Sequence, residues 1–162
     1  AAGDAICQSL AAAAGLGVPE TYMAWLSTPS ENAIDRFTYD GPWIRIDDVL
    51  VAASKADLTD SQLLTSVNFS ESGDYFGSRG VWTGATGAGQ AGGASCNEWT
   101  DDSGVYSGLT GYAYAVDERW TDGVEYECST SVFHLYCFSQ VAYLFVDGFE
   151  TGDTSAWSAT VP

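Results

Sequence analysis

The apolar positions near the start of the chain recur at helical spacing. Ile6, Leu10 and Ala14 share one face of a helix if residues 4–14 are helical, and Asp4 is a plausible cap at its start. A glycine-containing segment then breaks the pattern. The sequence therefore predicts one amphipathic helix at this end of the chain.

Short apolar runs separated by turn-rich polar segments make up most of the remaining chain. One further short helix is expected within residues 55–64, and the glycine-rich segment 84–95 is expected to be a loop. Asp47 and Asp48 separate two of the runs in the manner of a hairpin turn. The runs that read as strands are residues 21–26, 43–46, 49–52, 79–84, 112–116 and 132–138. This order of elements predicts an α+β fold with a mostly antiparallel sheet.

The last 22 residues, "VAYLFVDGFETGDTSAWSATVP", differ from the rest, and we separate a domain over residues 1–140 from a C-terminal strand and tail over residues 141–162. The first six are almost wholly apolar, which is typical of a strand buried on both faces. A lone apolar strand is an aggregation hazard unless something covers it, either its own sheet or a neighbouring molecule. The candidate assembly residues are Val141, Ala142, Tyr143, Leu144, Phe145, Val146, Phe149 and Trp157.

Composition and net charge limit the classes of molecule that this chain is expected to bind. The chain has 162 residues, of which 46% are hydrophobic, so one domain with a sizeable core is expected. With 22 acidic residues against 5 Lys and Arg, the net charge is −17, which argues against nucleic acid and anionic membranes as partners. No apolar run approaches the ~20 residues of a membrane span. The start "AAGDAICQ" suits a mature N-terminus from which a signal peptide has been removed.

Four cysteines are widely spread, at Cys7, Cys96, Cys128 and Cys137. They form no CxxC pair and only one histidine accompanies them, so a zinc site is not expected. Two disulfides and an oxidising, extracellular compartment fit better. Three pairings are possible from the residues alone.

Several strings occur in an order that resembles a known family: "ICQSLAAAAGLGVPETYMAWLS", "GVWTG", "SCNEWTD" and "HLYCF". They are similar to the endostatin-like branch of the C-type-lectin-like fold and to a family of uncharacterised secreted bacterial domains close to it. The resemblance spans roughly residues 4–140 and implies nested disulfides, Cys7 with Cys137 and Cys96 with Cys128. It also implies a late strand that brings the two ends of the domain together.

The family's known ligand sites do not carry over to this chain. The Glu-Pro-Asn or Gln-Pro-Asp loop and the Trp-Asn-Asp signature of calcium-dependent sugar-binding lectins are absent. The chain also lacks the histidines and the arginine-rich face of endostatin's zinc and heparin sites. The resemblance therefore implies a fold and not a ligand.

Two groups of side chains could still bind something. Asn97, Glu98, Asp101 and Asp102 offer oxygen ligands for calcium within six residues, and the alternative is an ordinary solvated acidic loop. Trp and Tyr rings near the long loops could stack on sugars or anchor a protein interface, or could belong to an aromatic core. The main candidates among these aromatics are Trp82, Trp99, Trp120 and Tyr106, accompanied by Trp43, Tyr112, Tyr114 and Tyr126.

The sequence contains no motif that indicates a catalytic site. No GxSxG elbow occurs, and the single His134 has no obvious partner in the sequence. We therefore expect a non-enzymatic, secreted bacterial subunit that assembles with itself into a filament or surface assembly through its terminal segments. The alternative is a lectin-like recognition or adhesion module that binds glycan or protein through the aromatic and acidic loops.

Overall fold

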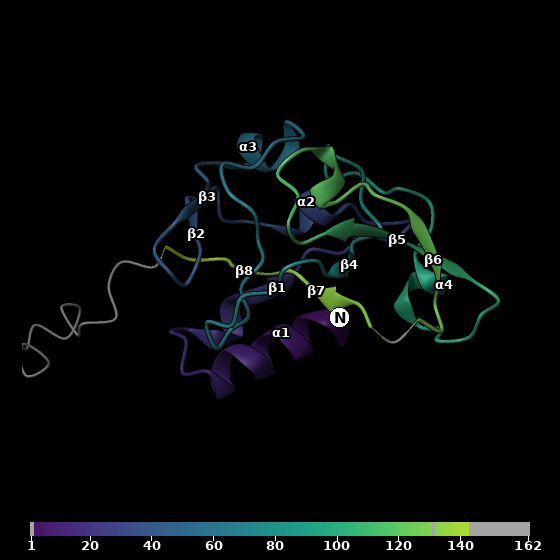
Figure 1. Ribbon diagram of the computed structural model, residues 1–162, viewed down its shortest axis with the longest axis horizontal. Coiled ribbons are helices and arrows are strands. Elements are labelled where there is room, and N and C mark those ends of the chain that lie inside the picture. The colour runs from purple at the N-terminus through teal and green to yellow at the C-terminus, as the bar shows by residue number, and fades with distance from the viewer. Residues whose placement is uncertain (1, 131, 143–162) are drawn as a thin grey trace, which may run out of the picture.

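The computed structural model describes residues 2–130 and 132–142 (Figure 1). The helices are α1 (Ala2–Ala13), η1 (Pro19–Thr21), α2 (Ala33–Arg36), α3 (Lys55–Thr59), α4 (Cys96–Trp99) and η2 (Glu118–Trp120). The strands are β1 (Tyr22–Ala24), β2 (Trp43–Ile44), β3 (Leu50–Ala52), β4 (Gly80–Trp82), β5 (Ser107–Tyr112), β6 (Glu125–Glu127), β7 (His134–Leu135) and β8 (Cys137–Ser139). The mixed α+β class is confirmed.

The strands form three small sheets. The largest has the order β6-β5-β4-β7, with antiparallel pairs except for β4 and β7, which are parallel. The hairpin β2–β3 and the pair β1–β8 are both antiparallel. The sheet is thus mostly antiparallel, as predicted.

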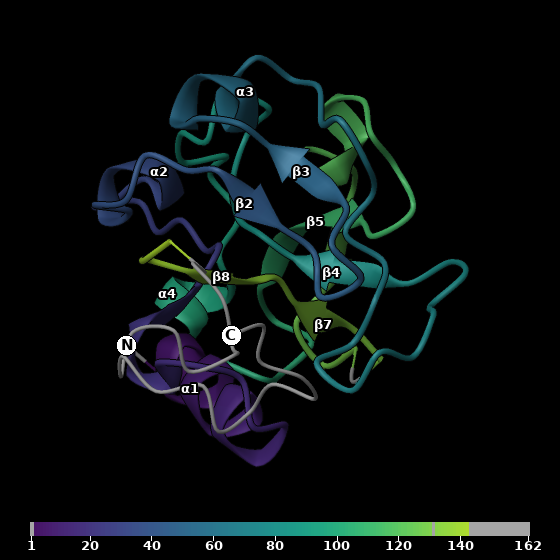
Figure 2. The same cartoon turned by 90° about the vertical axis from the view of Figure 1, so that its left-hand side faces the viewer.

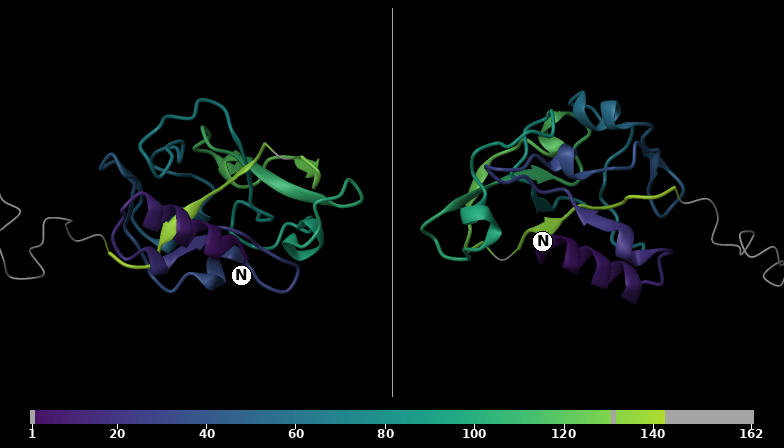
Figure 3. Two further views of the ribbon diagram at one scale, coloured as in Figure 1. Left: turned by 90° about the horizontal axis from the view of Figure 1, so that it is seen from below. Right: turned by 180° about the vertical axis from the view of Figure 1, so that it is seen from behind.

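The two ends of the described chain are tied together. β1 pairs with β8, and α1 packs along β1 on the outside of this pair (Figures 1 and 3). The disulfide Cys7–Cys137 joins α1 to β8 across 130 residues, and Cys96–Cys128 joins α4 to the chain after β6 across 32 residues. The nested pairing is confirmed.

The expected strand at 132–138 divides in two. β7 pairs with β4 in one sheet and β8 pairs with β1 in another, with Tyr136 between them. The side chains of Val132–Phe138 therefore do not alternate across one continuous sheet, because the two halves of the segment pair with strands of different sheets. This division makes the segment a bridge between the two sheets.

The strand expected at residues 112–116 lies earlier in the chain, in β5. The sequence concealed it because glycines occupy places where neighbours come close. A Cβ at Gly111 would lie 1.9 Å from the carbonyl oxygen of Trp120, and one at Gly108 would lie 2.8 Å from the Sγ of Cys96. Glycine therefore marks close approach here, although it ordinarily weakens a strand pattern.

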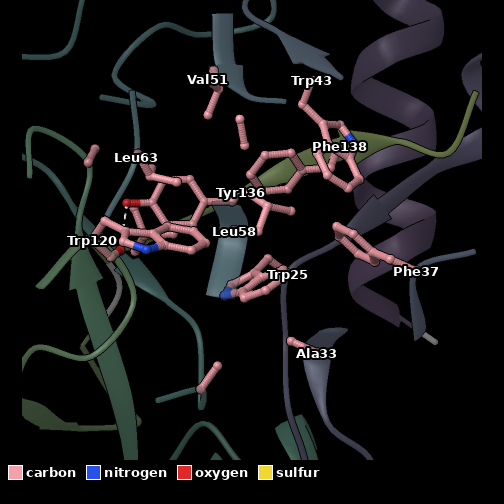
Figure 4. Close-up of a cluster of buried hydrophobic side chains, with 14 of the residues drawn as sticks. Trp25, Ala33, Phe37, Trp43, Val51, Leu58, Leu63, Trp120, Tyr136 and Phe138 are labelled. Atoms are coloured by element: carbon pink, nitrogen blue, oxygen red, sulfur yellow. Dashed lines mark hydrogen bonds between the residues drawn. The ribbon is translucent and has the colours of Figure 1, made fainter. Parts of the chain in front are cut away.

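Aromatic side chains fill the main core (Figure 4). Trp25 lies at its centre, with ring centroids 5.1 Å from Trp120 and 5.4 Å from Phe37. Tyr136 enters from the bridge segment and donates its hydroxyl hydrogen bond to the Trp120 carbonyl at 2.9 Å. Burial raises the pKa of that hydroxyl well above its usual range. The core thus holds the bridge segment in place, and one side of that segment faces the groove described next.

Candidate functional site

An apolar groove of about 640 Å³ runs along one side of the molecule. Residues 133–139, which include β7 and β8, form its floor. One wall is α1, and the other is the β2–β3 hairpin with the loop around Phe69 and Phe76. Figure 2 shows this side, with β8 between α1 below and β2 above.

Four aliphatic side chains line the groove and remain exposed. On the helical wall Ile6 is 50% and Leu10 40% exposed, and on the hairpin wall Ile44 is 50% and Ile46 43% exposed. Contiguous exposed apolar side chains on a folded protein typically mark an interaction surface. The groove is therefore the strongest candidate site in the described part of the chain.

The hairpin wall presents its isoleucines because burial alternates along its first strand. Trp43 is buried and donates from its Nε1 to the Ser139 carbonyl at 2.9 Å. Arg45, two residues on, also turns inward and donates to the Ser66 carbonyl at 2.7 Å and the Asn68 side chain at 3.0 Å. Ile44 and Ile46 then take the other face, as the two-residue period of extended chain requires.

The helical wall is held by a charged contact as well as by the disulfide. Both oxygens of Asp4 accept from Arg36 at 2.6 Å, and one of them also accepts from the Ala24 amide at 3.0 Å. Asp4 was expected to cap the helix, but α1 begins before it and its carboxylate reaches across to β1 and α2. Burial favours the neutral acid, yet the hydrogen bonds that the carboxylate accepts, those from Arg36 and Ala24 among them, outweigh this effect, and the pKa of Asp4 falls below its ordinary value.

Besides Arg45, the groove lining holds the ionisable side chains of Glu71, Arg79 and His134. His134 stacks on Phe76 with ring centroids 5.3 Å apart, and the guanidinium of Arg79 lies 5.7 Å from the centre of the same ring. Burial and the charge of Arg79 lower the pKa of His134, and the charge of Glu71 opposes them. No ion pair of Arg79 is present within residues 2–130 and 132–142.

The calcium candidates are not gathered into a group of metal ligands in the described structure. Within these residues no group of three or more His, Cys, Asp or Glu side chains is placed to hold a metal ion. Asp101 instead accepts from the Ser103 amide at 2.8 Å and the Ser103 hydroxyl at 2.5 Å. Asn97 donates to the Thr100 hydroxyl at 3.2 Å, and Glu98 lines a shallow hollow apart from Asp101 and Asp102. The acidic residues serve local turns and the surface.

That hollow has a volume of about 470 Å³. Asn97, Glu98 and Glu125 line it together with Tyr106, which is 46% exposed. Its floor follows α4, in which residues Cys96–Trp99 all have positive φ between 49° and 62°. Of the predicted ligand-binding aromatics, Tyr106 alone reaches this hollow.

The prediction that Trp120 is an exposed binding residue is wrong. Trp120 is 0% exposed and lies in the main core, and Trp43 is buried as well. Trp82 and Trp99 are partly buried against the small cluster around Cys7 and Leu26, and the Nε1 of Trp99 donates to the Ser27 carbonyl at 2.8 Å. Indole rings are large enough to be taken into an aromatic core wherever one exists.

Among the predicted assembly residues, Val141 and Ala142 lie at the groove and help to line it. They form a bend and an irregular segment, not the strand that was expected. Tyr143, Leu144, Phe145, Val146, Phe149 and Trp157 lie outside the described residues.

The sequence did not predict the groove. Ile6 and Leu10 had the spacing of a buried helix face, and Ile44 and Ile46 that of an ordinary strand. The only available signal was that residues 43–46 are short and flanked by polar turns, which leaves one strand face without a cover.

No protein-family model and no curated protein matches this chain. Among the described residues, no helix is long and apolar enough to cross a membrane. The two disulfides fit an extracellular protein.

Proposed function

We propose that this chain is a non-enzymatic structural subunit that assembles with itself outside the cell, into a filament or a surface assembly, through its terminal segments. The observation that carries the proposal is the apolar groove with four exposed aliphatic side chains, whose lining includes Val141 and Ala142. An uncharged apolar sequence, Tyr143–Val146, follows directly. The sequence thus continues from a residue of this surface into a segment that also needs cover.

The C-type-lectin-like fold remains part of the proposal. Three features support it: the N-terminal helix, the β1–β8 pair that joins the two ends, and the nested disulfides. Removal of a signal peptide before the described N-terminal helix belongs to the same proposal. The disulfides make such a subunit robust where no reducing system protects thiols.

The net charge of −17 sets a condition on assembly. Copies of the chain repel one another at low ionic strength, so contact between them must come from apolar burial. At 0.15 M salt the Debye length falls to ~8 Å and exposed charges are largely screened. Assembly is therefore expected to strengthen as salt is added, unlike binding driven by opposite charges.

Deletion of residues 143–162 tests the proposal. The deletion leaves every described contact in place, including the Ser139–Val141 hydrogen bonds that end β8. We expect the full chain to form elongated assemblies in negative-stain microscopy, and the shortened chain to be a folded monomer by light scattering. The proposal fails if the full chain stays monomeric at millimolar concentration and 0.15 M salt, or if assemblies persist without the tail.

A recognition or adhesion module is the second candidate, favoured by the hollow around Tyr106. An exposed tyrosine beside Asn97, Glu98 and Glu125 combines a stacking ring with hydrogen-bonding groups suited to a glycan or a polar protein surface. A glycan array probed with the tail-deleted chain, with and without calcium, tests it. Binding that survives tail deletion and is lost in Tyr106→Ala would support this function, and an array without hits would remove it.

A further inference from the structure

We propose that the groove is the acceptor for residues 143–146 of a second copy of this chain, so that copies join head to tail. This inference rests on the proposed self-assembly and names its interface. The donor segment is Tyr-Leu-Phe-Val, and the acceptor surface consists of Ile6 and Leu10 on one wall, Ile44 and Ile46 on the other, and the floor at residues 133–139.

The groove offers what an added strand requires. Its floor includes β7, which lies at the edge of the four-stranded sheet. An edge strand presents backbone N–H and C=O groups to a further strand, while pockets on either side select the side chains. At the bottom of the groove Val81, Tyr136 and Phe138 of the main core contribute to the lining, so an inserted side chain would extend the core.

The segment has the matching chemistry. Tyr143–Val146 carries no charge, and four extended residues span ~13 Å. In an extended segment Leu144 and Val146 point to one side and Tyr143 and Phe145 to the other. Leu144 and Val146 can enter between the two aliphatic walls while Tyr143 and Phe145 cover the opening. Alternatively, the two aromatic side chains can enter and the two aliphatic ones can cover the opening. Each arrangement removes apolar surface from water on both partners.

A second copy is favoured over the chain's own tail because of how β8 ends. The edge of β8 away from β1 is occupied at its last residue, where the Trp43 indole donates to the Ser139 carbonyl at 2.9 Å. A segment that turned back at Gln140 or Val141 would meet Trp43 first. Residues 140–146 contain no Gly, Pro, Asn, Asp or Ser, and the first turn-forming residues, Asp147 and Gly148, come after the apolar segment.

The charges beside the groove suit the residues that follow the donor segment. The acidic residues that follow the segment are Asp147, Glu150 and Asp153, and no cation accompanies them. Two of the five cations of the chain, Arg45 and Arg79, line the groove. Arg45 is paired with Asp47, whereas Arg79 forms no ion pair within the described residues. Glu71 is the acidic residue of this lining, so an incoming acidic tail meets two arginines and one carboxylate there.

The geometry favours an open chain of copies. The donating segment and the accepting groove are different surfaces of the subunit, so the contact is heterologous. Repeating a heterologous contact builds a filament unless the rotation closes a ring. This is the physical link between the groove and the proposed filament.

Mixing two variants of the full chain tests the inference. The donor-dead variant carries Leu144→Asp and Phe145→Asp. The groove-dead variant carries Leu10→Asp and Ile44→Asp, at positions that are 40% and 50% exposed, so folding is expected to survive. The matched control is Val105→Asp, at a position that is 80% exposed and does not line the groove.

Each variant alone is expected to be a monomer, and an equimolar mixture should give a species of twice the monomer mass and nothing longer. The reason is that the groove-dead chain still donates and the donor-dead chain still accepts, which allows one junction only. The Val105→Asp control should assemble as the unchanged chain does. A near-ultraviolet circular dichroism spectrum equal to that of the unchanged chain confirms the fold of each monomer.

Other outcomes overturn the inference and separate it from the proposed function. If the groove-dead chain still assembles while tail deletion prevents assembly, the groove is not the acceptor but the tail-driven function stands. If the mixture stays monomeric and tail deletion lowers the melting temperature of the monomer, the tail occupies its own groove. A closed dimer that never grows, or a small apolar molecule bound in the groove in native mass spectrometry, also excludes head-to-tail donation. A full chain that never assembles removes both proposals.

Discussion

Arg36 is the charged side chain on which the attachment of α1 depends, and its replacement gives a quantitative test of the fold. The guanidinium donates to both oxygens of Asp4 at 2.6 Å and to the carbonyls of Ala24 and Leu26 at 3.0 and 3.3 Å. The side chains of Arg36 and Asp4 are only 8% and 13% exposed. Arg36→Met keeps most of the aliphatic stem and removes every one of these hydrogen bonds.

The expected loss is large because the partner charge stays behind. Removing one member of a buried ion pair costs ~3–5 kcal/mol, since the remaining charge loses its main counter-charge while it stays largely out of water. Two backbone carbonyls lose a donor as well, while the amide of Ala24 still donates to Asp4 and softens the effect. We therefore expect the free energy of unfolding at pH 7 to fall by about 3 kcal/mol.

The pH dependence gives the argument a second check. The pKa of Asp4 in the folded protein lies below its ordinary value of 3.8, because hydrogen bonds outweigh the opposing effect of burial. A carboxyl group with a lowered pKa in the folded state stabilises the fold above its ordinary pKa, and that contribution is lost as the pH falls through the folded value. The difference between Arg36→Met and the unchanged chain should therefore shrink below about pH 4.

Urea unfolding with both disulfides intact, followed by tryptophan fluorescence, measures the effect. Arg119→Met is the matched control, because its ion pair with Asp117 is 56% and 45% exposed and such surface pairs contribute little to stability. If Arg36→Met costs no more than this control at pH 7, or if its effect does not diminish in acid, the assignment of Asp4 and Arg36 as the attachment of α1 is wrong.

Four further results are expected. Replacing Cys96 and Cys128 by serine should lower the free energy of unfolding by about 3–4 kcal/mol, because the disulfide closes a loop over 32 residues. Tyr136→Phe should cost about 1–3 kcal/mol, because it leaves the buried Trp120 carbonyl without its donor. Stability of the tail-deleted chain should decline as the pH falls below about 6.5, since burial lowers the pKa of His134 in the folded state, and His134→Gln should reduce this decline. Calcium and magnesium at equal millimolar concentration should shift the melting temperature equally, through screening alone.

Each of these has a result that would contradict it. A serine variant that matches the unchanged protein under non-reducing conditions would remove the constraint assigned to the second disulfide. Equal stability of Tyr136→Phe and the unchanged chain would mean that the Trp120 carbonyl finds another donor. A melting temperature that rises with calcium but not with magnesium would restore the calcium site. An unchanged acid profile in His134→Gln would assign that decline to other groups.

The local elements and the covalent framework were open to prediction because they depend on neighbours in sequence. Ile6 and Leu10 stand one helical turn apart, and the hairpin around Asp47 and Asp48 follows from two short apolar runs with a polar turn between them. Spread cysteines in a chain with a single histidine favour disulfides over metal sites. The local helix, the hairpin and the preference for disulfides therefore do not depend on how distant segments pack.

Burial and strand partners were decided only in three dimensions. The segment 132–138 looks like one strand, yet its two halves pair with β4 and β1 because the sheets they complete lie on different sides of Tyr136. Trp120 and Tyr106 are both aromatic residues with polar neighbours in the sequence. Only Trp120 is buried in the core, because it packs against Trp25. Residue type alone does not distinguish a ring that finds core neighbours from one that finds water.

The groove is the clearest case in which sequence and tertiary structure determine different properties of the chain. The sequence by itself determined that the chain carries an apolar segment after the last cysteine, and that this segment needs a cover. Only the tertiary structure decided where a cover of the right kind exists, because the two walls come from segments more than 30 residues apart and meet through Cys7–Cys137 and Trp43. A concave surface is a property of the contacts between distant segments, and local periodicity carries no record of it.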